Sequence, residues 1–360
     1  MAEMYCQRRE CAWNESSPTT PHTHPALKRG GVNVARTPIA VFSYNRPEHL
    51  RRALESLARC ARIEEVDVHM FCDAAKGISD ALDVEASRLV AAAFAPRLGA
   101  TVHYAPTNRG CDRSIVSAVT DLCALHGRAI VLEDDHIVSP DFLDYMLTGL
   151  DQYVDERRVY QISGFMYPIE TVTSVDAFFL PLITSRSWAT WDRAWRVFDW
   201  QVPGVNALFT NRAVRYRFDY CSRFGWSHVL HEGLSTGEPN WDTVWYWCVF
   251  RRSGYTLFPR KSLVWVGGWD GTGVHCGTVP PPQDPLSSFQ YRRLSDPLSL
   301  PTTIAVDAPS FSRMKRFAGR VEGHARPMKW AEALLYDELL MNHPWVLKQL
   351  QPIRRRLTTA

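Results

Sequence analysis

Short apolar runs alternate with amphipathic helical patterns along residues 39–132, and this alternation constrains the fold more than any other feature. The apolar runs have the length and composition of strands and lie at 39–43, 66–72, 100–104 and 129–132. Apolar stripes at helical spacing predict helices at about 47–58, 80–94 and 115–123. The β-α-β-α-β-α-β order predicts an α/β fold with a parallel, Rossmann-like sheet.

The fourth predicted strand is followed directly by three acids, Glu133, Asp134 and Asp135. Ligands of open α/β sheets bind at the carboxyl ends of the strands, so these carboxylates face the expected site. Adjacent carboxylates repel one another unless a cation neutralises them, and their hard oxygens suit Mn²⁺ or Mg²⁺, which often completes its shell with phosphate. The alternative is an acidic loop before a helix capped by Ser139, with Pro140 in the first turn.

Polar residues also follow the three earlier strands, and the sheet should bring them to the same edge. They are Arg46 after the first strand, Asp73 after the second, and Asn108, Arg109 and Arg113 after the third. Arginine suits phosphate, whereas a carboxylate accepts the N–H of a uracil-type ring. Each residue alone is ordinarily a solvated turn residue. Neither GxGxxG after the first strand nor GxxxxGK[ST] occurs, so no standard dinucleotide or P-loop site is expected.

The second half of the chain is rich in tryptophan, with ten of the thirteen between Trp188 and Trp269. Indole rings offer flat apolar faces that match the C–H face of a pyranose, although most tryptophans serve packing. Acids and turns surround Trp188, Trp191 and Trp241, which are therefore the candidates for contact with a sugar acceptor.

Bulk composition excludes some classes of protein. The net charge of +3 is too balanced to indicate nucleic-acid binding. Nine scattered cysteines without a CxxC pair favour reduced thiols, and no stretch has the length of a membrane span or the character of a signal peptide. A soluble cytoplasmic protein is expected. Arg354, Arg355 and Arg356 are compatible with peripheral association at the inner membrane face, although a solvated tail is the ordinary role of such residues.

The expected organisation has four parts. Residues 1–37 are a flexible leader rich in Pro, Thr, His and Ser, and 38–165 form a nucleotide-sugar-binding half. Residues 166–285 form a metal and acceptor half, and 286–360 are an extension with a helix from about Met328 and a basic tail.

The chain resembles GT-A glycosyltransferases, particularly the N-acetylglucosaminyltransferase I-like group and related bacterial family 2 enzymes, over about residues 38–280. The most specific segment is Ala129 to Asp135, followed by Ser139-Pro140-Asp141-Phe142, which is similar to the EDD version of the DxD motif in that group. Further similar segments lie in the second half, at 187–195, 240–245, 261–264 and 268–276.

The resemblance implies an inverting, metal-dependent enzyme that moves a sugar from a nucleotide-sugar donor to a glycan, glycolipid or glycoprotein acceptor. It implies Asp135 as the Mn²⁺ (or Mg²⁺) ligand, with Asp134 near the ribose or the metal's water shell and Glu133 in support. Arg46 and Asp73 match nucleotide contacts, Asp73 as the base reader, which favours a UDP- or dTDP-sugar.

The same resemblance implies Asp242 as the general base, although Thr243 stands where the animal enzymes have a second acid. Some GT-A enzymes also recruit a late histidine to the metal or diphosphate, which makes His275 a second candidate metal ligand. A lone loop histidine is otherwise an ordinary surface residue.

Two other functions remain open. Sugar-1-phosphate nucleotidylyltransferases share a similar sheet and metal requirement, but they need a glycine-rich loop after the first strand, and Ser43-Tyr44-Asn45-Arg46-Pro47 has no glycine. A non-catalytic carbohydrate-binding protein would keep the aromatic residues without needing the acids.

Overall fold

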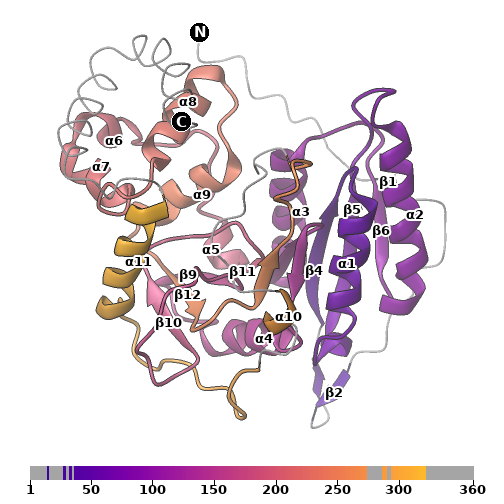
Figure 1. Ribbon diagram of the computed structural model, residues 1–360, viewed down its shortest axis with the longest axis horizontal. Helices are drawn as coiled ribbons and strands as arrows, with labels where there is room; N and C mark the ends of the chain where they lie inside the picture. The colour runs from indigo at the N-terminus through magenta and orange to yellow at the C-terminus, as the bar shows by residue number, and fades with distance from the viewer. Residues whose placement is uncertain are drawn as a thin grey trace. The chain divides into compact units, whose positions relative to one another are not determined.

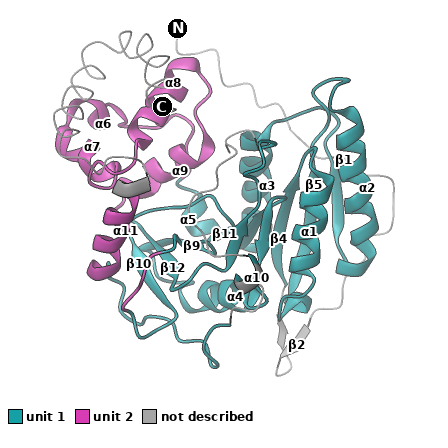
Figure 2. Cartoon of the chain, viewed as in Figure 1, with its two compact units in different colours: residues 1–168, 173–197, 254–306 teal, residues 169–172, 198–253, 307–360 magenta. Residues whose placement is uncertain are grey.

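The computed structural model describes residues 14–15, 27–29, 32–34, 36–273, 286–289 and 293–321 (Figure 1). The chain divides into two compact units (Figure 2). Unit 1 comprises 1–168, 173–197 and 254–306, and unit 2 comprises 169–172, 198–253 and 307–360. This division differs from the expected boundaries because the chain leaves unit 1 and returns to it, so that distant segments share one unit.

A nine-stranded sheet forms the centre of unit 1. Its strands are β1 (Asn14–Glu15), β4 (Thr37–Ser43), β5 (Val66–Cys72), β6 (Thr101–Tyr104), β7 (Arg128–Glu133), β9 (Val159–Ser163), β10 (Ala177–Leu180), β11 (Trp188–Trp191) and β12 (Tyr255–Pro259). Their order is β1-β6-β5-β4-β7-β11-β9-β12-β10. The four predicted strands are β4, β5, β6 and β7, and they pair in parallel, which confirms the α/β fold. β4 is buried along its whole length, as a strand covered on both faces should be.

The strand β11 runs antiparallel to both of its neighbours. It lies between β7 and β9, with Trp188 opposite Val131 on one side and Ser163 on the other. Consequently β9 runs in the same direction as β7. The start of β11 therefore lies at the edge of the sheet where β7 and β9 end, a relationship that the sequence pattern does not reveal.

The helices of unit 1 are α1 (Pro47–Leu57), the short 3₁₀ helix η1 (Ile63–Glu65), α2 (Ala81–Leu98), α3 (Cys111–His126), α4 (Phe142–Gln152), α5 (Asp192–Trp195) and α10 (Leu286–Phe289). The three predicted helices correspond to α1, α2 and α3 among them. In α1 the predicted apolar stripe is buried, including Leu50, Leu54 and Leu57, and Pro47 occupies the first turn. The helix α3 packs on β4 and β7. The helices packed on the sheet thus help to fix the positions of the strand ends.

Two small antiparallel pairs complete unit 1. They are β2 (Leu27–Arg29) with β3 (Val32–Val34), and β8 (His136–Val138) with β13 (Val264–Val266). In the second pair His136 is opposite Val266. This register places the residues after β13 beside those before β8, which include Asp135.

Unit 2 consists of helices and an aromatic core. Its helices are α6 (Asn206–Thr210), α7 (Arg212–Phe218), α8 (Trp226–Thr236), α9 (Trp241–Phe250) and α11 (Ala308–Val321). Phe218 stacks on Tyr246 with ring centroids 4.5 Å apart, and Trp245 and Trp247 are buried. These tryptophans of unit 2 therefore contribute to its hydrophobic core.

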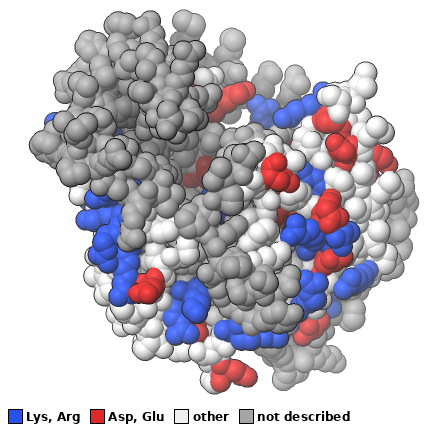
Figure 3. Space-filling model, in the orientation of Figure 1, with Lys and Arg blue, Asp and Glu red and all other residues white. Residues whose placement is uncertain are grey.

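The described residues of the chain contain no helix that is both long and apolar enough to cross a membrane. On the face drawn in Figure 3, basic side chains form small groups interspersed with acidic ones. The helix expected from Met328 and the arginines at 354–356 lie outside the described residues.

Candidate active site

The carboxyl ends of β4, β5, β6 and β7 share one edge of the sheet because these strands are parallel. The chain runs from β4 through β5 to β6 on one side and then crosses to β7 on the other side of β4, so the strand order reverses at β4. Such a switch point opens a crevice at the strand ends, where α/β proteins bind ligands. Arg46 follows β4 and Asp134-Asp135 follow β7, so the two groups face one another at this point.

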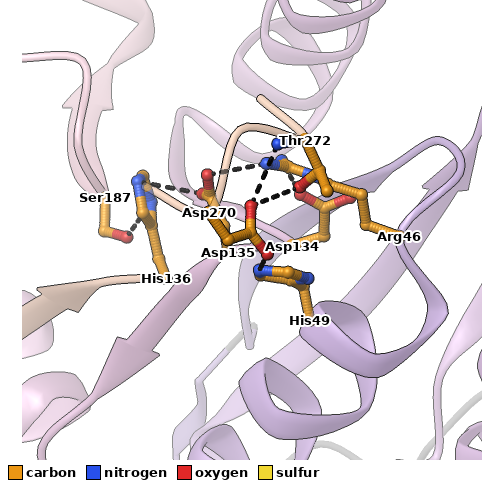
Figure 4. Close-up of polar contacts among 8 residues, drawn as sticks. All are labelled: Arg46, His49, Asp134, Asp135, His136, Ser187, Asp270 and Thr272. Atoms are coloured by element: carbon orange, nitrogen blue, oxygen red, sulfur yellow. Dashed lines mark hydrogen bonds and ion pairs between the residues drawn. The ribbon is translucent and has the colours of Figure 1, made fainter. Parts of the chain in front are cut away.

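Arg46 bridges the two aspartates (Figure 4). Its Nη1 atom donates to Oδ2 of Asp135 at 3.0 Å, and Nη2 donates to Oδ1 of Asp134. The residues Asp134 and Asp135 are 3% and 7% exposed, and the Arg46 side chain is 16% exposed. Two carboxylates are therefore held almost out of water by a single cation, so their desolvation offsets much of their attraction to Arg46.

Burial and charge act in opposite directions on these pKa values. Burial raises the pKa of Asp134 to about 6, although the charge of Arg46 opposes the rise. Burial also acts to raise the pKa of Asp135, but His136 and Arg46 outweigh it, so the pKa is lowered. Burial lowers the pKa of His136 to about 4, so this imidazole is neutral at pH 7 and Arg46 is the cation beside Asp135. The pKa values of the two neighbouring acids are therefore shifted in opposite directions, upward for Asp134 and downward for Asp135.

The acids do not cap a helix. The strand β8 separates them from α4, whose N-cap residue is Asp141. Asp134 and Asp135 thus lie between two strands, and the alternative interpretation of the acids as a helix-capping loop is wrong. Glu133 is the last residue of β7 and pairs with Phe42 of β4.

A loop after β13 lies against Asp135. The Gly267 amide donates to the Asp135 carbonyl oxygen at 2.8 Å. A Cβ atom on Gly268 would lie 2.1 Å from Asp135 Oδ2, so only glycine fits there. Further along, Asp270 Oδ2 lies 3.2 Å from His49 Nε2 of α1, and Asp270 Oδ1 accepts a hydrogen bond from the Thr272 hydroxyl at 2.6 Å. The loop is thereby fastened to the residues around the acid pair.

Three further residues lie near the acids and were not predicted from the sequence: His49, His136 and Ser187. His136 Nε2 lies 3.4 Å from Asp135 Oδ1, and its Nδ1 lies 3.0 Å from Ser187 Oγ. The histidine next to the acid triplet is visible in the sequence, but its partner lies 51 positions away. Only the register of β11 brings Ser187 to this edge.

Asp73 has a structural role in addition to any ligand role. Its carboxylate accepts hydrogen bonds from the backbone amides of Ala74, Arg109 and Gly110, at 2.8 to 3.2 Å. The last two amides precede α3, so Asp73 holds the start of that helix. The Asn108 side chain donates to the Ala74 carbonyl at 2.7 Å. The structure thus brings Asp73, Asn108 and Arg109 together, whereas Arg113 is exposed.

The tryptophans proposed for acceptor contact are buried. Trp188 is 0% and Trp191 2% exposed in β11, and Trp191 Nε1 donates to the Leu150 carbonyl at 3.0 Å. Neither ring has an open face for a sugar, so the structure contradicts an acceptor contact at both. Trp241 begins α9 in unit 2 and is 5% exposed, so the same physical objection applies to its ring.

Asp242 lies in the first turn of α9, where Oδ1 accepts a hydrogen bond from the Thr243 amide at 2.7 Å. It belongs to unit 2, whereas the acid pair belongs to unit 1. His275 lies outside the described residues.

Asp135 offers carboxylate oxygens, the kind of ligand atom that Mg²⁺ and Mn²⁺ prefer. Asp135 Oδ1 is buried and accepts no hydrogen bond within the described part of the chain. Among the described residues, no group of three or more His, Cys, Asp or Glu side chains is arranged to hold a metal. A cation on Asp135 would therefore need further oxygens from a ligand or from water, as Mg²⁺ and Mn²⁺ commonly do at phosphate sites.

No protein-family model and no curated protein matches this sequence. Similar solved structures include the mannosyltransferase PcManGT from Pyrobaculum calidifontis in complex with GDP-Man and Mn²⁺, at 16% identity, 43% of this chain, 44% of that chain and a TM-score of 0.31. S. aureus TarS 1-349 matches at 11% identity over 65% of this chain and 61% of that one, with a TM-score of 0.39.

An active-site mutant of LgtC matches at 13% identity over 45% of this chain and 60% of that one, with a TM-score of 0.30. The chain thus spans 44% to 61% of these three proteins. The TM-scores are too low for these likenesses to carry an argument about function, so that argument depends on the chain's own residues.

Proposed function

We propose that this protein is an inverting, metal-dependent GT-A glycosyltransferase that moves a sugar from a nucleotide-diphosphate donor to an acceptor hydroxyl. The observation that carries the proposal is the Asp134-Asp135 pair at the switch point of the sheet. Both carboxylates are nearly buried beside Arg46, and one Asp135 oxygen accepts no hydrogen bond within the described residues. The resemblance of the segment from Ala129 to Phe142 to the DxD region of such enzymes supports the same conclusion.

In this proposal Asp135 holds Mn²⁺ or Mg²⁺, which when bound would neutralise charge on the leaving diphosphate. Arg46 lies beside the same carboxylate, so its guanidinium is placed to contact a phosphate oxygen once the cation shares the acids. Asp134 balances the charge of Arg46. His275 is proposed as an additional ligand.

The nucleotide is proposed to lie along the edge formed by Asp73, Asn108 and Arg109, with Arg113 at its exposed end. UDP- and dTDP-sugars are the favoured donors because a carboxylate accepts the ring N–H of uracil or thymine. The Asp73 oxygens already accept three backbone amides, so a base would have to share an occupied acceptor. The backbone amides therefore fix the position of the Asp73 carboxylate before a base binds to it.

Asp242 is proposed as the general base that takes the proton of the acceptor hydroxyl as the new bond forms. The hydrogen bond from the Thr243 amide fixes one of its oxygens and leaves the carboxylate at the start of α9, where a helix stabilises negative charge. Attack from the face opposite the diphosphate inverts the anomeric centre. A glycan, glycolipid or glycoprotein hydroxyl is the proposed acceptor.

The test is a thermal-shift screen of UDP, GDP, CMP and dTDP, each with and without Mn²⁺. A nucleotide that binds the folded protein raises its melting temperature by mass action. We expect UDP or dTDP to stabilise the wild type more strongly with Mn²⁺ than without it. Stabilisation by none of the four nucleotides would contradict the proposed function.

A further inference from the structure

Asp135, His136 and Ser187 lie in a row at the end of β7 (Figure 4). His136 Nε2 is 3.4 Å from Asp135 Oδ1, and His136 Nδ1 is 3.0 Å from Ser187 Oγ. All three side chains are buried, with Ser187 0% and His136 3% exposed. None of the roles assigned above uses His136 or Ser187.

The charges of the row determine where its protons lie. A neutral imidazole carries one N–H, and a bare Nε2 would place its lone pair against the carboxylate of Asp135. The Nε2–H tautomer avoids this repulsion and directs a donor at Asp135 Oδ1. Nδ1 then accepts, and the Ser187 hydroxyl is its donor. In this pattern the Ser187 hydroxyl donates to Nδ1, whereas the Nε2–H group faces Asp135 Oδ1 at 3.4 Å without forming a hydrogen bond.

Ser187 is held in an unusual backbone conformation. Its φ angle is 47°, in the left-handed region that residues other than glycine rarely adopt. Its carbonyl oxygen accepts a hydrogen bond from the Gly164 amide at 2.7 Å, just beyond β9. Such strain is kept only where the surroundings impose it, and it clusters at functional sites. In this backbone conformation the Ser187 hydroxyl lies within hydrogen-bond distance of His136.

The row does not provide a nucleophile. Its order is similar to a serine-histidine-aspartate triad, but Ser187 is completely buried and cannot reach a substrate. The imidazole also presents Nε2 to the aspartate and Nδ1 to the serine. A role in orienting the carboxylate fits this burial better than a role in bond formation.

We propose that His136 and Ser187 are positioning residues that fix the Asp135 carboxylate for a divalent cation. Arg46 fixes Oδ2 from one side, and His136, itself held by Ser187, approaches Oδ1 from the other. A carboxylate oriented in this way loses less conformational entropy when it binds a metal. Loss of the residues that orient a metal ligand typically weakens metal affinity 10- to 100-fold. This inference rests on the proposed function, because it assumes that Asp135 is the ligand.

The experiment measures Mn²⁺ binding to the full chain by the electron paramagnetic resonance signal of free Mn²⁺, without nucleotide. His136→Leu and Ser187→Gly should each weaken the affinity by about 10-fold or more. His136→Gln retains an N–H donor and should restore part of the loss. Ser187→Gly is informative because glycine accepts the left-handed backbone without strain, so the variant should fold while lacking the hydroxyl.

Matched controls separate positioning from general damage. His69→Leu removes another largely buried histidine, and Ser253→Gly replaces another serine with a positive φ of 51°, so neither should change Mn²⁺ affinity. Unchanged affinity in both His136→Leu and Ser187→Gly would overturn the positioning role while leaving the proposed function intact. Wild-type binding that is absent, or unaffected by Asp135→Ala, would instead overturn the metal assignment and this inference with it.

Discussion

Gly268 lies so close to Asp135 that a Cβ atom at this glycine would be 2.1 Å from the carboxylate oxygen Oδ2. The same added atom would be 3.2 Å from Arg46 Nη1. The loop after β13 and the acid pair therefore fit together only through the absence of a side chain. Gly268→Ala should displace either the loop or the carboxylate.

We expect Gly268→Ala to weaken Mn²⁺-dependent nucleotide stabilisation by about 10-fold or more in apparent affinity, because a small misplacement of a ligand is costly. Thermal shift against nucleotide concentration measures this. Gly77→Ala is the matched control, since no heavy atom lies within 4 Å of the Cβ that it adds. Equal affinities for the two variants would show that the close contact does not constrain the site.

Asp135→Asn should abolish the extra stabilisation that Mn²⁺ gives to a bound nucleotide. The amide keeps the size of the side chain but lacks the negative charge that a hard cation requires. Asp134→Asn should retain more of the effect, because Asp134 mainly faces Arg46. The proposed division of roles is contradicted if Asp134→Asn is the more damaging of the two in the same thermal-shift titration.

Arg46→Ala should destabilise the protein by about 3–5 kcal/mol in the absence of divalent cations, because it leaves two buried carboxylates without their cation. Urea unfolding measures this loss, and Mn²⁺ should restore part of it by replacing the missing charge. Arg51→Ala, on the helix α1 that begins directly after Arg46, is the control. Its side chain is 41% exposed, and its ion pairs with Glu48 and Glu55 are screened by solvent, so this variant should lose far less stability than Arg46→Ala.

Asp242→Asn should lower kcat by about 100-fold or more while leaving donor affinity nearly unchanged, as expected for loss of a general base. Steady-state turnover and nucleotide thermal shifts separate the two effects. Glu238→Gln, an exposed acid in the same unit, should change neither. If the donor affinity of Asp242→Asn collapses while kcat is retained, Asp242 binds substrate instead.

Acid should destabilise unit 1 through His69. Burial and the charges of His103 and His126 lower the pKa of His69 from 6.5 to about 4. The contribution of neutral His69 to the free energy of unfolding is complete above pH 6.5 and is lost as the pH falls towards 4. The reason is that in this range His69 binds a proton in the unfolded chain but not in the folded one. At pH 5 the loss is about 2 kcal/mol.

Urea unfolding of the wild type and His69→Gln at pH 7.5 and pH 5 measures this contribution. The variant lacks the titrating ring, so its stability should fall less between the two pH values. Identical changes in both proteins would show that His69 does not carry the effect.

The parallel half of the fold could be predicted from the sequence because each element there carries its own signal. β5 was expected at 66–72 and lies at Val66–Cys72, and the Pro47 helix begins where the proline indicates. The edge that carries Arg46, Asp73 and Asp135 follows from parallel pairing alone. These predictions needed only local periodicity and one rule of topology.

The remaining features depend on pairings between distant segments. The position of Ser187 requires the reversed strand β11, and that of Gly268 requires the pairing of β13 with β8. Local sequence does not encode either register. The burial of Trp188 and Trp191 was missed for a related reason: an indole next to acids and turns looks the same in sequence whether its ring faces solvent or the core.

The reversal of β11 also affects which segments of the chain reach this site. In a purely parallel sheet, only the residues that follow the strands lie at the ligand-binding edge. Here β11 is reversed, so Ser187, which precedes that strand, lies at the same edge. The segment from Leu180 to Ser187 therefore reaches this edge from β10, without passing through the pairing of β4 with β7. Through Ser187 and His136, this entering segment is connected to Asp135.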